Sequence, residues 1–99
     1  MRLITRALEL DPDNPSYLDS LGWAHFKRGD LAQAETYLSK AAEGLPRNSV
    51  VQDHYGDLLA KRGRHADAVA AWKKALAGDG EDVERAAIEK KIRDAQARR

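Results

Sequence analysis

Apolar and polar residues alternate along the chain with the period of an amphipathic helix. Within residues 15–28, Leu18, Leu21, Gly22 and His25 recur at helical spacing and give one face for packing. The polar residues between them fall on the opposite side. This pattern predicts a helix that packs through one face against a neighbour.

The boundaries of this helix and the start of the next are marked by capping residues. Asn14 suits the N-cap, and Pro15 suits the first turn because its missing N–H has no helical partner there. Gly29 suits a left-handed ending. Asp30 is expected to cap the following helix, with Gln33 completing a pair similar to a capping box.

The same construction returns further along the chain. The second helix carries an inward-facing apolar set, namely Leu31, Ala34, Leu38, Ala41 and Ala42. Asn48 is expected to cap a helix over 49–62, Gly63 to end it, and residues 65–77 to return antiparallel to it. Gly78 to Gly80 break the chain. A final helix is predicted over 82–97, with one apolar side made of Val83, Ala87, Ile88, Ile92 and Ala95.

The chain also repeats itself at an offset of 34 residues. This offset places Lys27-Arg28-Gly29 on Lys61-Arg62-Gly63, Gly22 on Gly56, and Ala34 on Ala68. Small residues recur where two antiparallel helices approach closely. A period of this length is typical of a helical repeat array.

The repeat resembles the tetratricopeptide family, whose pattern is W-x2-L-G-x2-Y…A-x3-F…P. The first copy reads Leu18-x2-Leu21-Gly22-x2-His25…Ala34-x3-Leu38…Pro46. The second copy reads Gln52-x2-Tyr55-Gly56-x2-Leu59…Ala68-x3-Trp72…Gly80. Gln52 departs from the usual large apolar residue, and Gly80 from the closing proline.

The resemblance implies an all-α fold, an α-solenoid of antiparallel helix pairs in a right-handed superhelix, closed by a C-terminal capping helix. A single domain over 1–99 then divides into a half repeat (1–14), two repeats (15–48 and 49–82) and the capping helix (83–99). Residues 2–10 align with the end of a second helix whose partner is missing. We therefore expect the C-terminal portion of a longer, bacterial-type protein, or an open edge at Leu3, Ile4 and Leu8 that mediates a homo-oligomer.

The resemblance also implies binding of a partner protein, peptide or helix on the concave side, which the first helix of each pair lines. The residues expected there are Ser16, Asp19, Ser20, Trp23, Phe26, Lys27, Val50, Asp53, His54, Asp57, Ala60 and Lys61. The aspartates favour a partner with basic residues, unless they form only a solvated helix face. Trp23 and Phe26 are either partner anchors or packing between neighbouring first helices.

Charge and composition exclude other classes of binding. The chain has 17 basic and 16 acidic residues and a formal net charge of +1, which argues against nucleic-acid binding. The basic residues of the last helix interleave with acidic ones, as in Glu89 and Arg93 at i,i+4. No apolar run reaches the roughly 20 residues that membrane insertion needs. The chain has no cysteine, which leaves the compartment undecided. The start of the chain does not resemble a signal peptide.

No arrangement of residues predicts an enzyme, a cofactor or a metal site. Asp53 and His54 are adjacent and diverge by roughly 100° around a helix, and no HExxH spacing is present. Ser20, His54 and Asp57 do not make a triad, because nothing holds a nucleophile on a strained turn or forms an oxyanion hole. An activity elsewhere in a longer parent protein remains an open alternative.

Overall fold

The structure, a computed structural model, describes residues 14–80 and 83–98. Within these residues the fold is all-α, with five helices and no strand. The helices are α2 (Pro15–Lys27), α3 (Leu31–Gly44), α4 (Ser49–Lys61), α5 (His65–Ala77) and α6 (Arg85–Ala97). The predicted fold class is confirmed. The predicted edge at Leu3, Ile4 and Leu8 lies outside the described residues.

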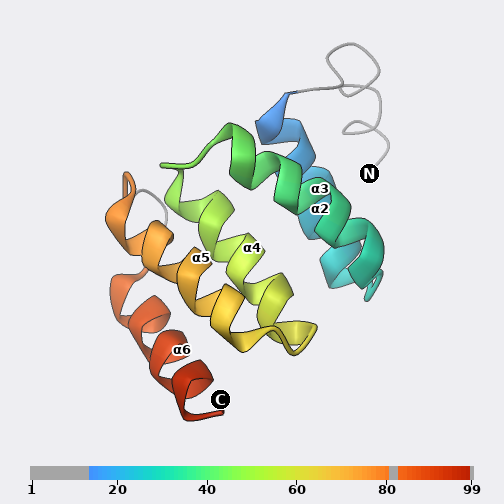
Figure 1. Cartoon of the computed structure of the whole chain (residues 1–99). Coiled ribbons are helices and arrows are strands. Elements are labelled where there is room, and N and C mark those ends of the chain that lie inside the picture. The colour runs from blue at the N-terminus through green and yellow to red at the C-terminus, as the bar shows by residue number, and fades with distance from the viewer. Residues whose placement is uncertain (1–13, 81–82, 99) are drawn as a thin grey trace.

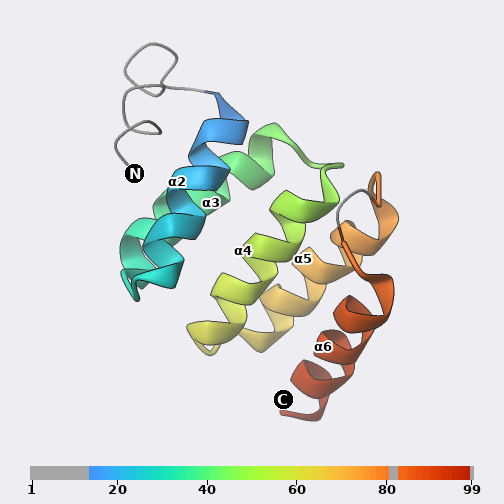
Figure 2. The ribbon, with the colours of Figure 1, turned by 180° about the vertical axis from the view of Figure 1, so that it is seen from behind.

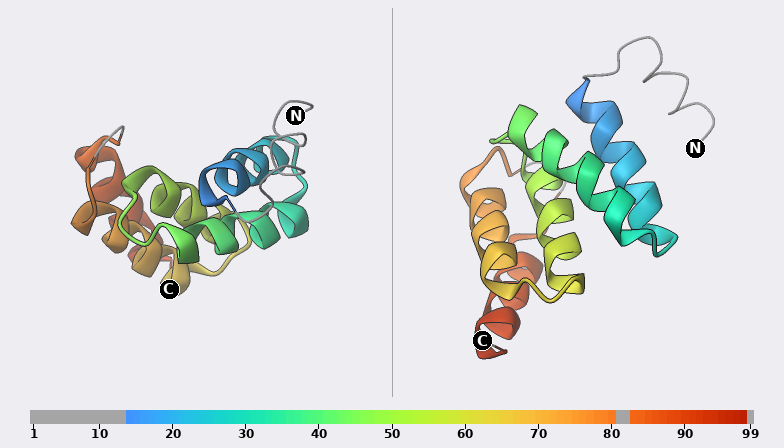
Figure 3. Two further views of the ribbon diagram at one scale, coloured as in Figure 1. Left: turned by 90° about the horizontal axis from the view of Figure 1, so that it is seen from above. Right: turned by 45° about the vertical axis from the view of Figure 1, so that its right-hand side comes forward.

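The helices form two antiparallel pairs followed by a single helix. In Figure 1, α3 and α5 face the viewer, and the view from behind in Figure 2 brings α2, α4 and α6 forward. The two further views in Figure 3 show the same two layers. We call α2, α4 and α6 the first-helix layer, and α3 and α5 the second-helix layer. The helices of the first-helix layer run in the same direction, so their C-terminal ends lie at one edge.

Helix boundaries follow the capping residues closely. The Asn14 side-chain oxygen accepts from the backbone N–H of Ser16 at 3.0 Å and of Tyr17 at 3.3 Å. The Asn48 side chain accepts from the Val51 N–H at 3.1 Å. These bonds satisfy backbone donors that a helix start leaves without partners. Gly29 and Gly63 end α2 and α4 with φ of +85° and +82°, as predicted.

Two local predictions were wrong. Asp30 lies at the N-cap of α3, but its side chain makes no capping hydrogen bond and lies instead 3.5 Å from His25 Nδ1. The final helix begins at Arg85 rather than at residue 82, so Val83 precedes it, and Ala87 is exposed rather than inward-facing. Its apolar stripe therefore consists of Ile88, Ile92 and Ala95, all buried.

Small residues allow the two helices of each pair to approach closely. A Cβ on Gly22 of α2 would lie 2.7 Å from Leu38 Cγ of α3. A Cβ on Gly56 of α4 would overlap the indole ring of Trp72 on α5. The repeated glycine is thus a packing requirement, since any larger side chain would separate the helices.

Two buried polar residues join helices through hydrogen bonds to the backbone, Gln52 between the two pairs and Ser49 within the second pair. Gln52, at the position where an apolar residue is usual, is 2% exposed, and its Nε2 donates to the Ala42 carbonyl at 3.1 Å. Ser49 is fully buried; its Oγ donates to the Ala75 carbonyl at 2.6 Å and accepts from the Gly80 N–H at 2.7 Å. Ser49 therefore ties the start of α4 to the end of α5 and to the loop before α6.

Candidate partner-binding groove

The first-helix layer is hollowed where the C-terminal ends of α2, α4 and α6 come together. We call this hollow, of about 380 Å³, the end groove. Its apolar surface comes from Phe26, Ala60, Trp72 and Ala95, and its polar lining from Asp57, Lys61, His65, Lys91, Asp94 and Arg98. An apolar surface with a few polar groups around it is typical of a binding site.

A stacked cluster joins α2 to α4 beside the end groove. The ring of Trp23 stacks on Phe26 with centroids 4.8 Å apart, and on His54 at 3.9 Å. His54 Nδ1 lies 3.0 Å from Asp19 Oδ1 and 3.2 Å from Oδ2. Asp19 is only 9% exposed. The cluster therefore packs neighbouring first helices together, which was one of the two interpretations of Trp23 and Phe26.

A second cluster joins α4 to α6. Lys91 Nζ donates to Asp53 Oδ1 at 2.6 Å and to Asp57 Oδ1 at 2.8 Å. The Trp72 indole N–H also donates to Asp57 Oδ1, at 3.2 Å. Two acidic side chains expected to face a partner are thus bound by a lysine of the same chain. Asp53 and Asp57 are therefore only partly exposed, because α6 brings Lys91 over them.

Burial and charge act in opposite directions within this second cluster. Burial raises the pKa of Asp57, and the contact with Lys91 offsets this only in part. Burial lowers the pKa of Lys91, but its hydrogen bonds to Asp53 and Asp57 outweigh burial, and the net pKa is raised. The folded structure therefore favours the charged form of Lys91 and disfavours the charged form of Asp57.

The predicted binding residues fall into three places. Phe26, Ala60, Asp57 and Lys61 line the end groove. Ser16, Asp19, Ser20 and Val50 line a smaller hollow of about 220 Å³ near the N-terminal ends of α2 and α4. Trp23, Lys27, Asp53 and His54 lie in or against the two clusters.

The sequence pattern missed the part of the end groove that comes from outside the first helices. Trp72 reaches it from α5, while Lys91, Asp94, Ala95 and Arg98 come from α6 or its end. The only available signal was the apolar stripe of α6, which predicts a packed helix but not its position.

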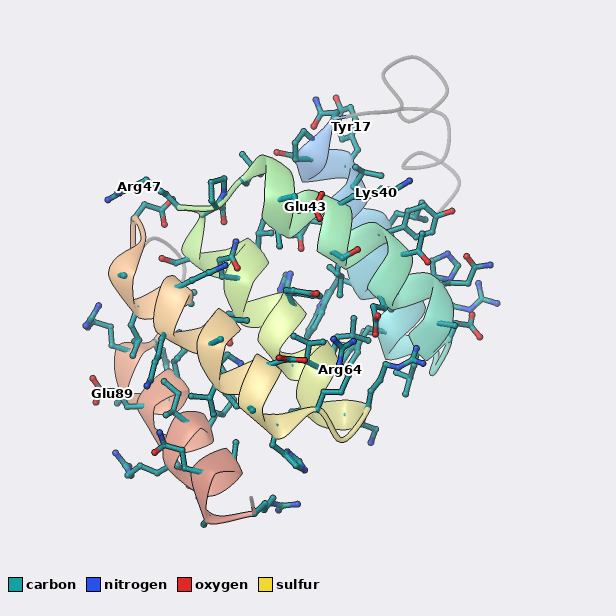
Figure 4. The ribbon with its side chains drawn as sticks, in the orientation of Figure 1. Tyr17, Lys40, Glu43, Arg47, Arg64 and Glu89 are labelled. Carbon is teal, nitrogen blue, oxygen red and sulfur yellow. The ribbon has the colours of Figure 1, made fainter. Side chains whose placement is uncertain are left out.

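The second-helix layer carries a different hollow, of about 390 Å³, lined by residues that include Tyr55 and Arg64. Arg64, labelled in Figure 4, donates to Asp67 at 3.0 Å and to Glu35 at 3.1 Å, and these two carboxylates raise the pKa of Arg64. Burial raises the pKa of Tyr55, and the Glu35 carboxylate adds to the rise. These ion pairs join the turn after α4 to α3 and α5.

The described residues show neither a metal centre nor a membrane span. Residues 14–80 and 83–98 hold no group of three His, Asp or Glu side chains placed to bind a metal ion. None of the helices in this part of the chain has the length and apolar character that a bilayer crossing requires.

Paired helices, glycine-mediated packing and a hollowed first-helix layer define a helical-repeat protein. A tetratricopeptide-repeat family model matches residues 3–36. The chain is a tetratricopeptide-repeat (TPR) protein. Domains of this family are generally protein–protein interaction modules and are typically non-catalytic.

Relatives and solved structures agree with this assignment. The chain is 44% identical over 55 residues to the TPR repeat-containing protein PA4667 of Pseudomonas aeruginosa, covering 56% of this chain and 9% of that protein. It is 32% identical over 74 residues to the TPR repeat-containing protein MJ1428 of Methanocaldococcus jannaschii, covering 75% of this chain and 13% of that one. The chain thus spans only about a tenth of the length of these curated relatives.

Two solved structures show the shared fold. The Sgt2 TPR domain from Aspergillus fumigatus superposes with a TM-score of 0.85 at 22% identity, covering 98% of this chain and 64% of that one. A structure of MamA AMB-1 gives a TM-score of 0.80 at 26% identity, covering 97% of this chain and 55% of that one.

Proposed function

We propose that this chain binds a segment of a partner protein in the end groove, as an adaptor or assembly module. The observation that carries the proposal is the groove itself: Phe26, Ala60, Trp72 and Ala95 give it an apolar surface, and charged side chains of α4 and α6 surround it. Apolar anchors in a pocket supply most of the free energy of a typical interface, and charged surroundings supply specificity.

Two side chains suit the role of anchor contacts. Phe26 and Trp72 come from different pairs, and both line the groove. Trp72 is 3% exposed and held by Asp57, so it offers a fixed surface rather than a mobile one. A preorganised surface loses little entropy when a partner binds.

The test is a bulky substitution in the groove with a matched control outside it. Ala60→Arg projects a long side chain into the groove from half-buried Ala60, whereas Ala66→Arg places the same side chain on an exposed position of α5. Arginine is nearly as good a helix former as alanine, so both variants keep α4 and α5. Circular dichroism checks that both remain folded.

Immobilised wild type and both variants are compared for capture of proteins from a lysate of the source organism. We expect Ala60→Arg to lose a partner that wild type and Ala66→Arg retain, by about tenfold or more for a contact worth roughly 1.4 kcal/mol. Equal capture by all three would refute binding in the end groove. Capture of the chain only by itself, with a mass that rises with concentration in sedimentation, would support the alternative of self-association.

A further inference from the structure

The acidic residues of α2 and α4 are already engaged within the chain. Asp19 faces His54 at 3.0 Å, and Asp53 and Asp57 share Lys91 at 2.6 and 2.8 Å. A basic partner would have to compete with an intramolecular lysine whose side chain is only one third exposed. The aspartates therefore do not present free negative charge to a partner.

The repeated Lys-Arg pairs divide between the two sides of the molecule. In each pair the arginine contacts a carboxylate of the second-helix side: Arg28 lies 4.0 Å from Asp30, and Arg62 lies 3.4 Å from Glu35. The lysines do not. Lys27 lies over the Trp23 ring at 5.2 Å, and Lys61 lines the end groove.

A row of cations results along the edge where α2, α4 and α6 end. Lys27, Lys61 and Arg98 are all exposed, and within residues 14–80 and 83–98 none of them has a carboxylate at ion-pair distance. The groove also holds one exposed acid, Asp94, likewise without an ion pair in this part of the chain. Cations near helix C-termini offset the helix dipole, but that role does not require them to line a hollow.

We infer that the end groove takes an acidic peptide segment, with an apolar side chain against Phe26 and Trp72 and a neighbouring carboxylate between Lys61 and Arg98. The inference rests on the proposed function and names the partner class for the same site. It reverses the sign of the partner charge expected from the sequence. The apolar surface supplies a place for the anchor, and the two free cations flank that place from α4 and from the end of α6.

The test is selection from a display library of random 12-residue peptides, carried out in parallel on wild type, Lys61→Glu, Lys40→Glu and Ala60→Arg. Lys40 is an exposed lysine of α3 and provides the matched charge reversal (Figure 4). Peptides count as groove ligands only if Ala60→Arg fails to retain them. Thermal unfolding followed by circular dichroism checks each variant.

We expect the groove ligands of wild type to combine Asp or Glu with an aromatic or aliphatic residue. The affinity of a synthesised ligand should fall about tenfold or more on Lys61→Glu, stay within about twofold on Lys40→Glu, and weaken as salt is added. Selection on Lys61→Glu should shift toward neutral or basic peptides.

The possible failures separate the two proposals. Groove ligands that are basic, or acidic ligands that bind Lys61→Glu as well as wild type, would overturn the acidic-segment inference and leave groove binding intact. If no selected peptide depends on Ala60, groove binding fails, and the inference fails with it.

Discussion

Single residues decide how closely the helices of each pair approach. A Cβ on Gly56 has no room beside Trp72, whose ring is fixed by the hydrogen bond to Asp57. Replacing glycine with alanine in a helix usually stabilises it by up to about 1 kcal/mol. At this position overpacking costs typically about 1–3 kcal/mol, so the steric effect dominates.

We therefore expect Gly56→Ala to lower the free energy of unfolding by up to about 2 kcal/mol, the overpacking cost less the gain in helix propensity. Urea denaturation measures it. The double variant Gly56→Ala/Trp72→Leu should lose less than the sum of the two single variants, because the smaller side chain leaves room for the methyl group. A stabilised Gly56→Ala variant would show that the helices separate without cost.

A second residue-scale prediction concerns Ser49, whose hydroxyl serves the Ala75 carbonyl and the Gly80 N–H in a fully buried position. Ser49→Ala leaves both groups without that partner, which should cost about 1–3 kcal/mol. Ser39→Ala is the control, since Ser39 bonds only within its own helix. Similar unfolding midpoints for the two variants in urea would contradict this role of Ser49.

At the scale of elements, α6 is held to the rest by an apolar stripe and by Lys91. The Lys91 ion pairs are partly exposed, so Lys91→Met should cost only about 1 kcal/mol at neutral pH. Lys90 is exposed and makes no ion pair in the described part of the chain, so Lys90→Met should change stability by less than about 0.5 kcal/mol.

Alkaline pH should weaken the fold through Lys91 and Tyr55. Both have raised pKa values in the folded state, so their contributions are fully present below the ordinary values of 10.5 and 10.0 and are lost as pH rises through the raised values. Wild type should lose more stability than Lys91→Met or Tyr55→Phe between about pH 9 and pH 12. Parallel stability curves for the three proteins, from urea denaturation at each pH, would refute this assignment.

The elements themselves were largely predictable, whereas the contacts between them were not. Asn14, Asn48, Gly29 and Gly63 mark boundaries by local chemistry, so the bounds of α2 and α4 were predicted to within a residue. The Lys91 contact joins residues 34 and 38 positions apart, and nothing local to either partner signals it. Asp30 was also not predictable in detail, because its side chain lies beside His25 and makes no capping hydrogen bond.

The candidate site was likewise predictable only in the part that the local sequence pattern determines. Phe26, Ala60, Asp57 and Lys61, which the repeat register places on one face of the first helices, line the end groove. Trp72 and Arg98 line it only because α5 and α6 fold against α4. These tertiary contacts decide which charges remain unpaired. Lys91 pairs with Asp53 and Asp57, whereas Lys27 and Lys61 have no ion pair within the described residues.

At the scale of the whole molecule, each helix packs only against near neighbours, as in other repeat proteins. The joint between the first and second pairs therefore depends on few contacts, among them Asp19 with His54. Asp19→Ala should lower the opening free energy of α2 and α3 amides by about 1–2 kcal/mol and change α6 amides far less. Native-state hydrogen exchange resolves the two regions, and a uniform loss of protection would show that the molecule opens as one unit.

The placement of the two tryptophans gives the molecule two separate optical reporters. Trp72 of α5 is buried against α4, with Lys91 over its ring, so its emission follows unfolding of the second pair. Trp23 is half-buried and stacked on His54 at the side of the first-helix layer, so its emission follows changes beside the end groove. Trp23→Phe and Trp72→Phe variants would each leave a single fluorophore, and occupancy could then be observed separately from unfolding without any attached label.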